Sequence, residues 1–191
     1  MEFAETSPEG FPLRPKNFLH LGSRPAVHQA FSRLARQDRL RRIFQGVYMR
    51  TVETRFGRRG PSVDKAIPEL SELWGEVIVP SGGAAANLLG LTDQVPMRRI
   101  YLTSGPDRRL VFGARKVDLR HAPNWQLVAP HRPSGTLVRA LTFLSREEVE
   151  DALGLVAPKL SDADIAELLA VREILPVWIA EPLNAFESHV R

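Results

Sequence analysis

The segment from Arg24 to about Gln37 constrains the fold most, because its apolar residues repeat with the period of an α-helix. Val27, Phe31 and Leu34 stand at positions i, i+4 and i+7 and form a single stripe. The preceding Ser23 can cap the helix at its N-terminus. The sequence therefore predicts an amphipathic helix with one buried face. The opposite face carries polar and basic side chains, namely Arg24, His28, Gln29, Ser32, Arg33 and Arg36.

Shorter elements are expected on both sides of this helix. Residues 15–22 start with Pro and end with Gly, which predicts a short helix. Residues 40–44 and 47–50 are β-prone and enclose a Gly-containing turn, which predicts a hairpin. Short helix, turn, polar-faced helix and hairpin follow one another in this order in a winged helix-turn-helix. We expect this motif between residues 11 and 50, in a domain of residues 1–57.

Basic residues are concentrated in the N-terminal part of the chain. Residues 14–60 hold twelve Lys and Arg against two acids, a net charge of +10, whereas residues 141–191 hold four bases against ten acids, a net charge of −6. Of the 26 basic residues 22 are Arg, whose planar guanidinium suits phosphates and guanine edges. This asymmetry favours nucleic-acid binding, although a GC-rich genome or a solvated Arg-rich face of a protein-binding domain gives the same composition.

The predicted helix and hairpin assign a role on double-stranded DNA to each polar side chain. A recognition helix places its early polar residues against base edges in the major groove, while flanking residues contact phosphates. The residues expected to reach bases are Arg24, His28, Gln29 and Arg33, with Ser32 on the same face. Those expected to contact the phosphate backbone are Arg36, Arg41, Arg42 and Arg50.

After a Gly/Arg-rich linker at residues 57–61, residues 61–191 are predicted to form one domain. The expected helices are 63–74 (interrupted or restarted at Pro68), 83–89, 135–143, 147–155 and 162–174, with Pro176 and Pro182 breaking the tail. The expected strands are 76–79, 98–103, 109–112 and 115–120, the last three forming a meander with alternating apolar residues. The predicted fold class is thus α+β, with an N-terminal winged helix-turn-helix followed by a mixed sheet domain covered by helices.

Residues that could support catalysis or bind a cofactor do not cluster in the sequence. Residues 79–84 lie between a strand and a helix but lack the Gly-rich phosphate-binding spacings, and Ser81 lacks the G-x-S-x-G context of a hydrolase. The five His show no metal-ligand spacing, and Cys is absent. Asp107 and Asp118 with Arg120 only weakly imitate a nuclease site. We therefore expect no enzyme activity, no metal and no cofactor.

The chain also lacks the sequence signals of a membrane protein. No apolar run approaches the roughly 18 residues of a membrane-spanning helix. The N-terminus does not have the basic-then-apolar order of a signal peptide. We expect a cytoplasmic protein without a membrane partner.

Several blocks of the sequence resemble AbiEi-type antitoxins over nearly the whole chain. They are residues 17–24 (NFLHLGSR), 31–34 (FSRL), 40–48 (LRRIFQGVY), 80–91 (PSGGAAANLLGL), 94–96 (QVP), 100–103 (IYLT) and 175–178 (LPVW). The resemblance implies an antitoxin of a type IV toxin–antitoxin system that also represses its own operon through the winged helix. It further implies a nucleotidyltransferase-like toxin from the adjacent gene as functional partner, without a stable complex. The usual first helix of the winged domain is shortened to residues 1–6 at most.

Two alternatives to this interpretation remain open. A transcription regulator would sense a small ligand in an enclosed apolar pocket within residues 61–191. A nucleic-acid-processing enzyme would require acids converging on a metal. Under the antitoxin interpretation, the polar face of the predicted sheet is the candidate antitoxin surface; it comprises Arg99, Lys116 and Arg120.

Overall fold

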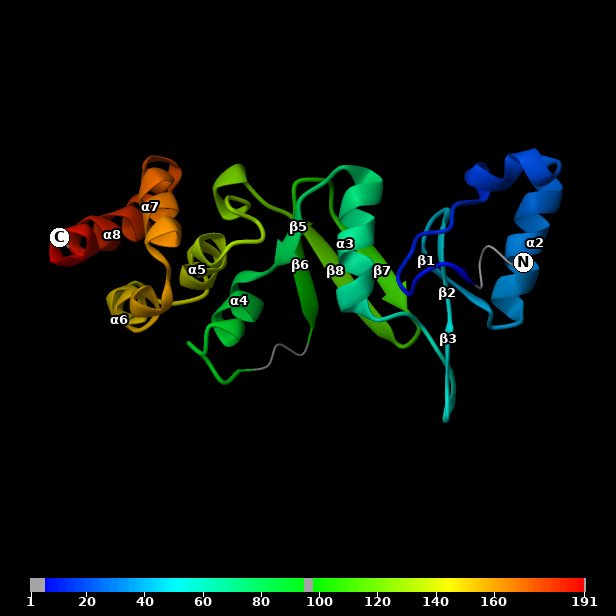
Figure 1. Ribbon diagram of the computed structural model, residues 1–191, viewed down its shortest axis with the longest axis horizontal. Helices are drawn as coiled ribbons and strands as arrows, with labels where there is room; N and C mark the ends of the chain where they lie inside the picture. The colour runs from blue at the N-terminus through cyan, green and yellow to red at the C-terminus, as the bar shows by residue number, and fades with distance from the viewer. Residues whose placement is uncertain (1–5, 95–97, 191) are drawn as a thin grey trace. The chain divides into compact units, whose positions relative to one another are not determined.

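The computed structural model describes residues 6–94 and 98–190, with side chains up to residue 184, and has an α+β fold (Figure 1). The chain divides into two compact units. Unit 1 comprises Met1–Glu76 and Arg108–Asp118, and unit 2 comprises Val77–Asp107 and Leu119–Arg191. The shortened first helix expected at residues 1–6 lies almost wholly outside the described residues.

Unit 1 begins with the elements predicted from the helical stripe. A 3₁₀ helix, η1 (Pro15–Leu21), precedes α2 (Arg24–Arg36), and an antiparallel hairpin follows, formed by β1 (Leu40–Phe44) and β2 (Val47–Arg50). These elements confirm the predicted helix and hairpin. They share one core, in which the stripe of α2 meets both flanks: Leu13, Val27, Phe31 and Leu40 are buried and Phe18, Leu34 and Tyr48 pack against them.

A second hairpin follows where the sequence predicted a linker. Strands β3 (Val52–Thr54) and β4 (Gly57–Arg59) are antiparallel, so the interpretation of residues 57–61 as a linker is wrong at its N-terminal end. Gly57 has a φ of +98°, a conformation that favours glycine, and the Thr54 hydroxyl donates to the Gly57 carbonyl at 2.7 Å. The turn therefore depends on backbone geometry that a Gly/Arg-rich composition does not reveal.

Helix α3 (Val63–Trp74) belongs to unit 1, and hydrogen bonds to Glu9 hold its N-terminal end. The helix is continuous through Pro68, which the sequence left open. The Glu9 carboxylate accepts hydrogen bonds from the backbone N–H of Ser62 at 2.9 Å, from Lys65 at 2.7 Å and from Arg59 at 2.8 Å. Unit 1 thus continues past residues 57–61 as far as Glu76, and the contacts of Glu9 join the start of α3 to the N-terminal segment.

Replacing Glu9 with Gln is expected to lower the free energy of unfolding at pH 7 by roughly 1–2 kcal/mol. Burial raises the pKa of Glu9, but the hydrogen bonds from Lys65, Ser62 and Arg59 outweigh it and lower the pKa from 4.5 to about 2. A depressed carboxyl pKa contributes stability above pH 4.5 that is lost as the pH falls toward 2. Denaturant titrations between pH 2 and 7 should show a weaker acid dependence for the variant. An exposed control, Glu150→Gln, should behave as wild type; equal curves for Glu9→Gln and wild type would contradict the assignment.

The sheet strands follow the predicted ranges but not the predicted order. They are β5 (Ile78–Pro80), β6 (Arg99–Thr103), β7 (Arg108–Phe112) and β8 (Arg115–His121), hydrogen-bonded in the order β5-β6-β8-β7. A meander would place β7 beside β6, so that prediction is wrong. The alternation itself is confirmed in β8, where Val117 and Leu119 are buried between exposed or half-buried residues. Alternation identifies the buried face of a strand but does not identify its neighbours.

Most of unit 2 consists of helices, which pack mainly against one another beside the strands (Figure 1). These are α4 (Gly82–Leu88), α5 (Pro133–Leu141), α6 (Arg146–Val156), α7 (Asp162–Ala170) and α8 (Val177–Val190), with 3₁₀ helices η2 (Asn124–Gln126), η3 (Ala157–Lys159) and η4 (Arg172–Ile174). Pro182 lies inside α8, so the predicted break there is wrong. A Cβ on Gly82 would lie 2.8 Å from the Arg139 carbonyl oxygen, which shows how closely α4 approaches α5. Trp178 packs against the helical core, as expected.

Candidate nucleic-acid interface

Helix α2 separates its apolar and polar residues as the stripe predicted. Val27 and Phe31 are each 7% exposed and face the core of unit 1. The Ser23 hydroxyl accepts a hydrogen bond from the Ala26 N–H at the start of the helix. The polar side chains predicted to face DNA are all exposed: Arg24, His28, Gln29, Ser32, Arg33 and Arg36. All six are therefore accessible, but they do not share one side of the helix: Arg24 and His28 border a cleft beside η1, whereas Arg33 borders an apolar pocket on the other side.

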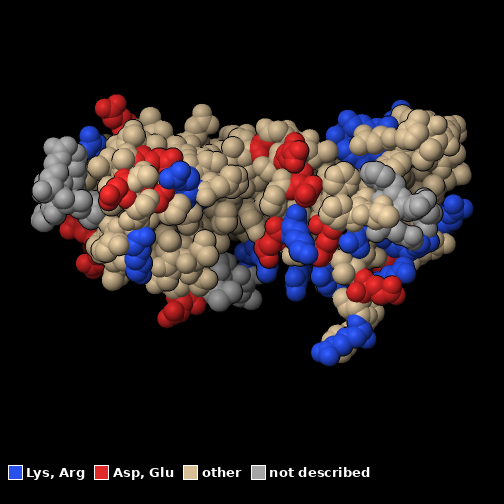
Figure 2. All heavy atoms as spheres, viewed as in Figure 1, with Lys and Arg blue, Asp and Glu red and all other residues tan. Residues whose placement is uncertain are grey.

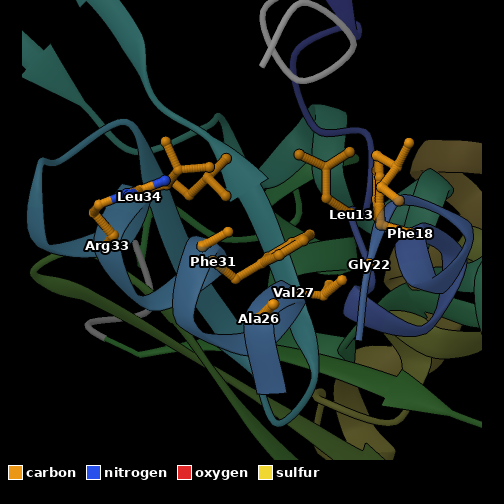
Figure 3. Close-up of a pocket in the computed structure, with 11 residues that line it drawn as sticks. Leu13, Phe18, Gly22, Ala26, Val27, Phe31, Arg33 and Leu34 are labelled. Atoms are coloured by element: carbon orange, nitrogen blue, oxygen red, sulfur yellow. The ribbon is translucent and has the colours of Figure 1, made fainter. Parts of the chain in front are cut away.

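An apolar pocket of about 260 Å³ lies between η1 and α2 (Figure 3). Leu13 and Phe18 line it from the N-terminal side, and Ala26, Val27 and Phe31 line it from α2. The pocket belongs to the N-terminal elements, whereas the ligand-sensing alternative placed an apolar pocket within residues 61–191. The apolar residues that line the pocket thus pack η1 against the buried face of α2.

The residues predicted to contact phosphates differ in their surroundings. Arg41 forms an ion pair with Asp38 at 2.8 Å, and the Arg50 Nε donates to the Ser7 carbonyl at 2.6 Å. Arg36 and Arg42 are exposed, and neither meets a carboxylate among the described residues. Arg41 and Arg50 therefore have protein partners, whereas Arg36 and Arg42 meet no carboxylate among the described residues.

The β3–β4 hairpin contributes residues that the sequence analysis missed. Phe56 at its turn is 86% exposed, and the Arg55 guanidinium lies 4.6 Å from the centre of its ring. Arg58 on β4 is exposed as well. Figure 2 shows Lys and Arg atoms at the projecting tip of this hairpin. The turn of this hairpin thus places an exposed aromatic ring beside exposed arginines. Gly57 after Arg55 and Phe56 was the available sequence signal for a turn, but the linker prediction for residues 57–61 assigned Gly57 and Arg58 to a connection between domains.

Several cations elsewhere in the molecule have acidic partners. Arg108 pairs with Glu76, Arg109 with Asp118 at 2.7 Å, and Arg132 with Asp164 at 3.0 Å. By contrast, no carboxylate in the described ranges, 6–94 and 98–184, pairs with the exposed arginines of α2. Cations without internal partners are the ones available to phosphates.

The candidate antitoxin surface does not lie within one unit. Lys116 belongs to unit 1, whereas Arg99 and Arg120 belong to unit 2. Arg120 pairs with Asp107 at 2.7 Å, with both side chains about half exposed. The pKa of Asp107 is lowered, first by the backbone N–H of His121 and then by Arg120. Arg99 also has a partner within the protein. The three residues are thus divided between the two units.

Within the part of the chain that the structure describes, no group of three or more His, Asp or Glu is placed to hold a metal ion. Over the same residues, no helix is both long and apolar enough to cross a membrane.

The sequence of the chain matches one described protein family. A model of the family DUF6088, a family of unknown function, matches residues 2–163, and the chain therefore belongs to that family. No curated protein matches the chain.

Proposed function

We propose that residues 11–50 form a winged helix-turn-helix that binds double-stranded DNA, with α2 as its recognition helix. The observation that carries this proposal is the exposed polar face of α2, whose arginines have no carboxylate partner among the described residues. The buried apolar stripe on the other side fixes this face outward.

The dimensions of α2 suit the major groove. At about 1.5 Å per residue, its 13 residues span roughly 20 Å, and the groove is wide enough to admit one helix. Arg24, His28, Gln29 and Arg33 then face base edges, with Ser32 on the same surface. Arg36 and Arg42 contact phosphates, and the tip of β3–β4 adds Arg55 and Arg58.

We propose further that the protein is a type IV antitoxin that represses its own operon. Support comes from the blocks that resemble AbiEi-type antitoxins and from the opposite charges of residues 14–60 and 141–191. The proposed partners are operator DNA and a nucleotidyltransferase-like toxin with which it forms no stable complex. The proposal includes a cytoplasmic location and no catalytic activity.

A gel-shift titration with DNA from the protein's own promoter tests duplex binding. About five phosphate contacts give log K against log salt a slope of roughly −4 to −5. Arg33→Ala is expected to cost about 1–3 kcal/mol on the operator if it reads a guanine, and to relax specificity there. Arg42→Ala should weaken operator and random DNA alike. If the wild-type protein binds operator and random DNA with equal affinity, or if its binding does not depend on salt, the proposal is wrong.

A further inference from the structure

A cleft of about 580 Å³ lies at the edge of the candidate interface, and all of its lining belongs to unit 1. It is enclosed by η1, the first turns of α2, the β1–β2 turn and the last residue of α3. This volume is within the range of small-molecule sites. The side chains that give it its chemistry are Arg14, Lys16, Arg24, His28, Phe44 and Trp74.

The cleft is positively charged without internal compensation. Its lining includes no Asp or Glu. Among the described residues, no carboxylate pairs with Arg14, Lys16 or Arg24. Arg41 and Arg59, which lie elsewhere in unit 1, have Asp38 and Glu9 as partners. Three uncompensated cations around one hollow favour a ligand that carries negative charge.

Two aromatic rings form another part of the wall. Phe44 and Trp74 meet edge to face, with ring centres 5.9 Å apart. The Arg108 guanidinium lies 4.3 Å from the centre of the Trp74 ring. Arg108 is itself held by two hydrogen bonds to the Glu76 carboxylate, one of them 2.8 Å long. The Trp74 ring is therefore fixed before any ligand arrives, as a stacking surface requires.

We propose that this cleft binds a nucleotide, with its phosphate at Arg14, Lys16 and Arg24 and its base against Phe44 and Trp74. Phosphate-binding cations beside aromatic rings are the combination by which proteins hold unpaired nucleotides. The ligand is either a free nucleotide or a nucleotide of a single strand, since both present the same chemistry. The site shares Arg24 and His28 with the proposed duplex interface but does not depend on duplex binding.

Isothermal titration of the full-length protein tests the site with thymidine monophosphate, thymidine and inorganic phosphate as separate probes. The monophosphate is expected to bind at least about tenfold more tightly than either of its parts. The same titration with a single strand of five thymidine nucleotides shows whether the ligand is a free nucleotide or part of a single strand. Tighter binding of the strand points to single-stranded nucleic acid, and equal binding points to the free nucleotide. Inorganic phosphate binding as well as the nucleotide would overturn the proposal.

Two variants locate the binding within the cleft. Lys16→Glu combined with Arg24→Glu changes only exposed side chains and should weaken the monophosphate at least about tenfold. Trp74→Leu should remove the preference for nucleotide over phosphate, with circular dichroism as the test of folding. Arg115→Glu combined with Arg146→Glu, two exposed cations outside the lining, is the matched control and should bind as wild type. Unchanged affinity in the Lys16/Arg24 variant contradicts the proposal even where Trp74→Leu fails to fold.

A gel shift with the promoter duplex separates this site from the proposed function. A protein that binds thymidine monophosphate but not the duplex supports the cleft and contradicts the proposed DNA interface. A protein that binds the duplex but no nucleotide or single strand overturns the cleft alone.

Discussion

Replacing Arg24, Arg33 and Arg42 together with Glu is expected to weaken operator binding more than a hundredfold. All three side chains are exposed, so the fold should tolerate the change. At about 1 kcal/mol for each lost contact, the low end of the range for Arg on DNA, the sum of ~3 kcal/mol already exceeds a factor of 100. Repulsion between the new carboxylates and phosphates adds to this loss. Gel shifts and fluorescence anisotropy at a fixed salt concentration measure the effect.

A matched control separates a local interface from a general effect of net charge. Arg115, Arg146 and Lys159 are exposed cations outside α2 and the hairpins, and replacing them with Glu changes the net charge by the same amount. This control should keep operator binding within a few-fold of wild type. If it loses as much affinity as the first variant, the proposed interface is wrong and binding follows total charge.

The sequence predicted those parts of the fold that short-range periodicity determines. The stripe of Val27 and Phe31 located α2, and alternation in β8 located its buried face. Strand order and the position of Glu9 could not be predicted in this way. The Glu9 carboxylate meets residues more than 50 positions away, and such pairings depend on the folded chain rather than on local pattern.

The candidate site likewise combines features that local sequence patterns predict with features that only the folded chain shows. The polar face of α2 follows directly from its helical period, and the structure confirms that those side chains are exposed. The proposed cleft does not follow from the sequence, because it joins Arg14 and Lys16 to Trp74, which stands almost 60 residues later. Likewise Arg50 seemed available to phosphate until the structure placed it on the Ser7 carbonyl, 43 residues away.

Repression and protection from the toxin are expected to be separable activities of the full chain. The basic elements near α2 suit phosphates, whereas residues 141–191, with a net charge of −6, would be repelled by them. The Arg24/Arg33/Arg42 variant should therefore lose repression completely and still protect cells when both genes are driven from foreign promoters. A reporter on the native promoter and growth under toxin induction measure the two activities.

The reciprocal variant changes the candidate antitoxin surface. Arg99→Glu combined with Arg120→Glu should lose protection and keep repression, because both residues lie in unit 2 and outside the DNA-binding elements. The exposed Arg120–Asp107 ion pair contributes at most about 1 kcal/mol, so its loss should not unfold the protein. Substitutions are preferable to truncation here. Unit 1 includes residues 108–118 as well as 1–76, and no single cut of the chain releases unit 2 intact. Stably produced α2 variants that lose protection together with repression would show that the two activities share one surface.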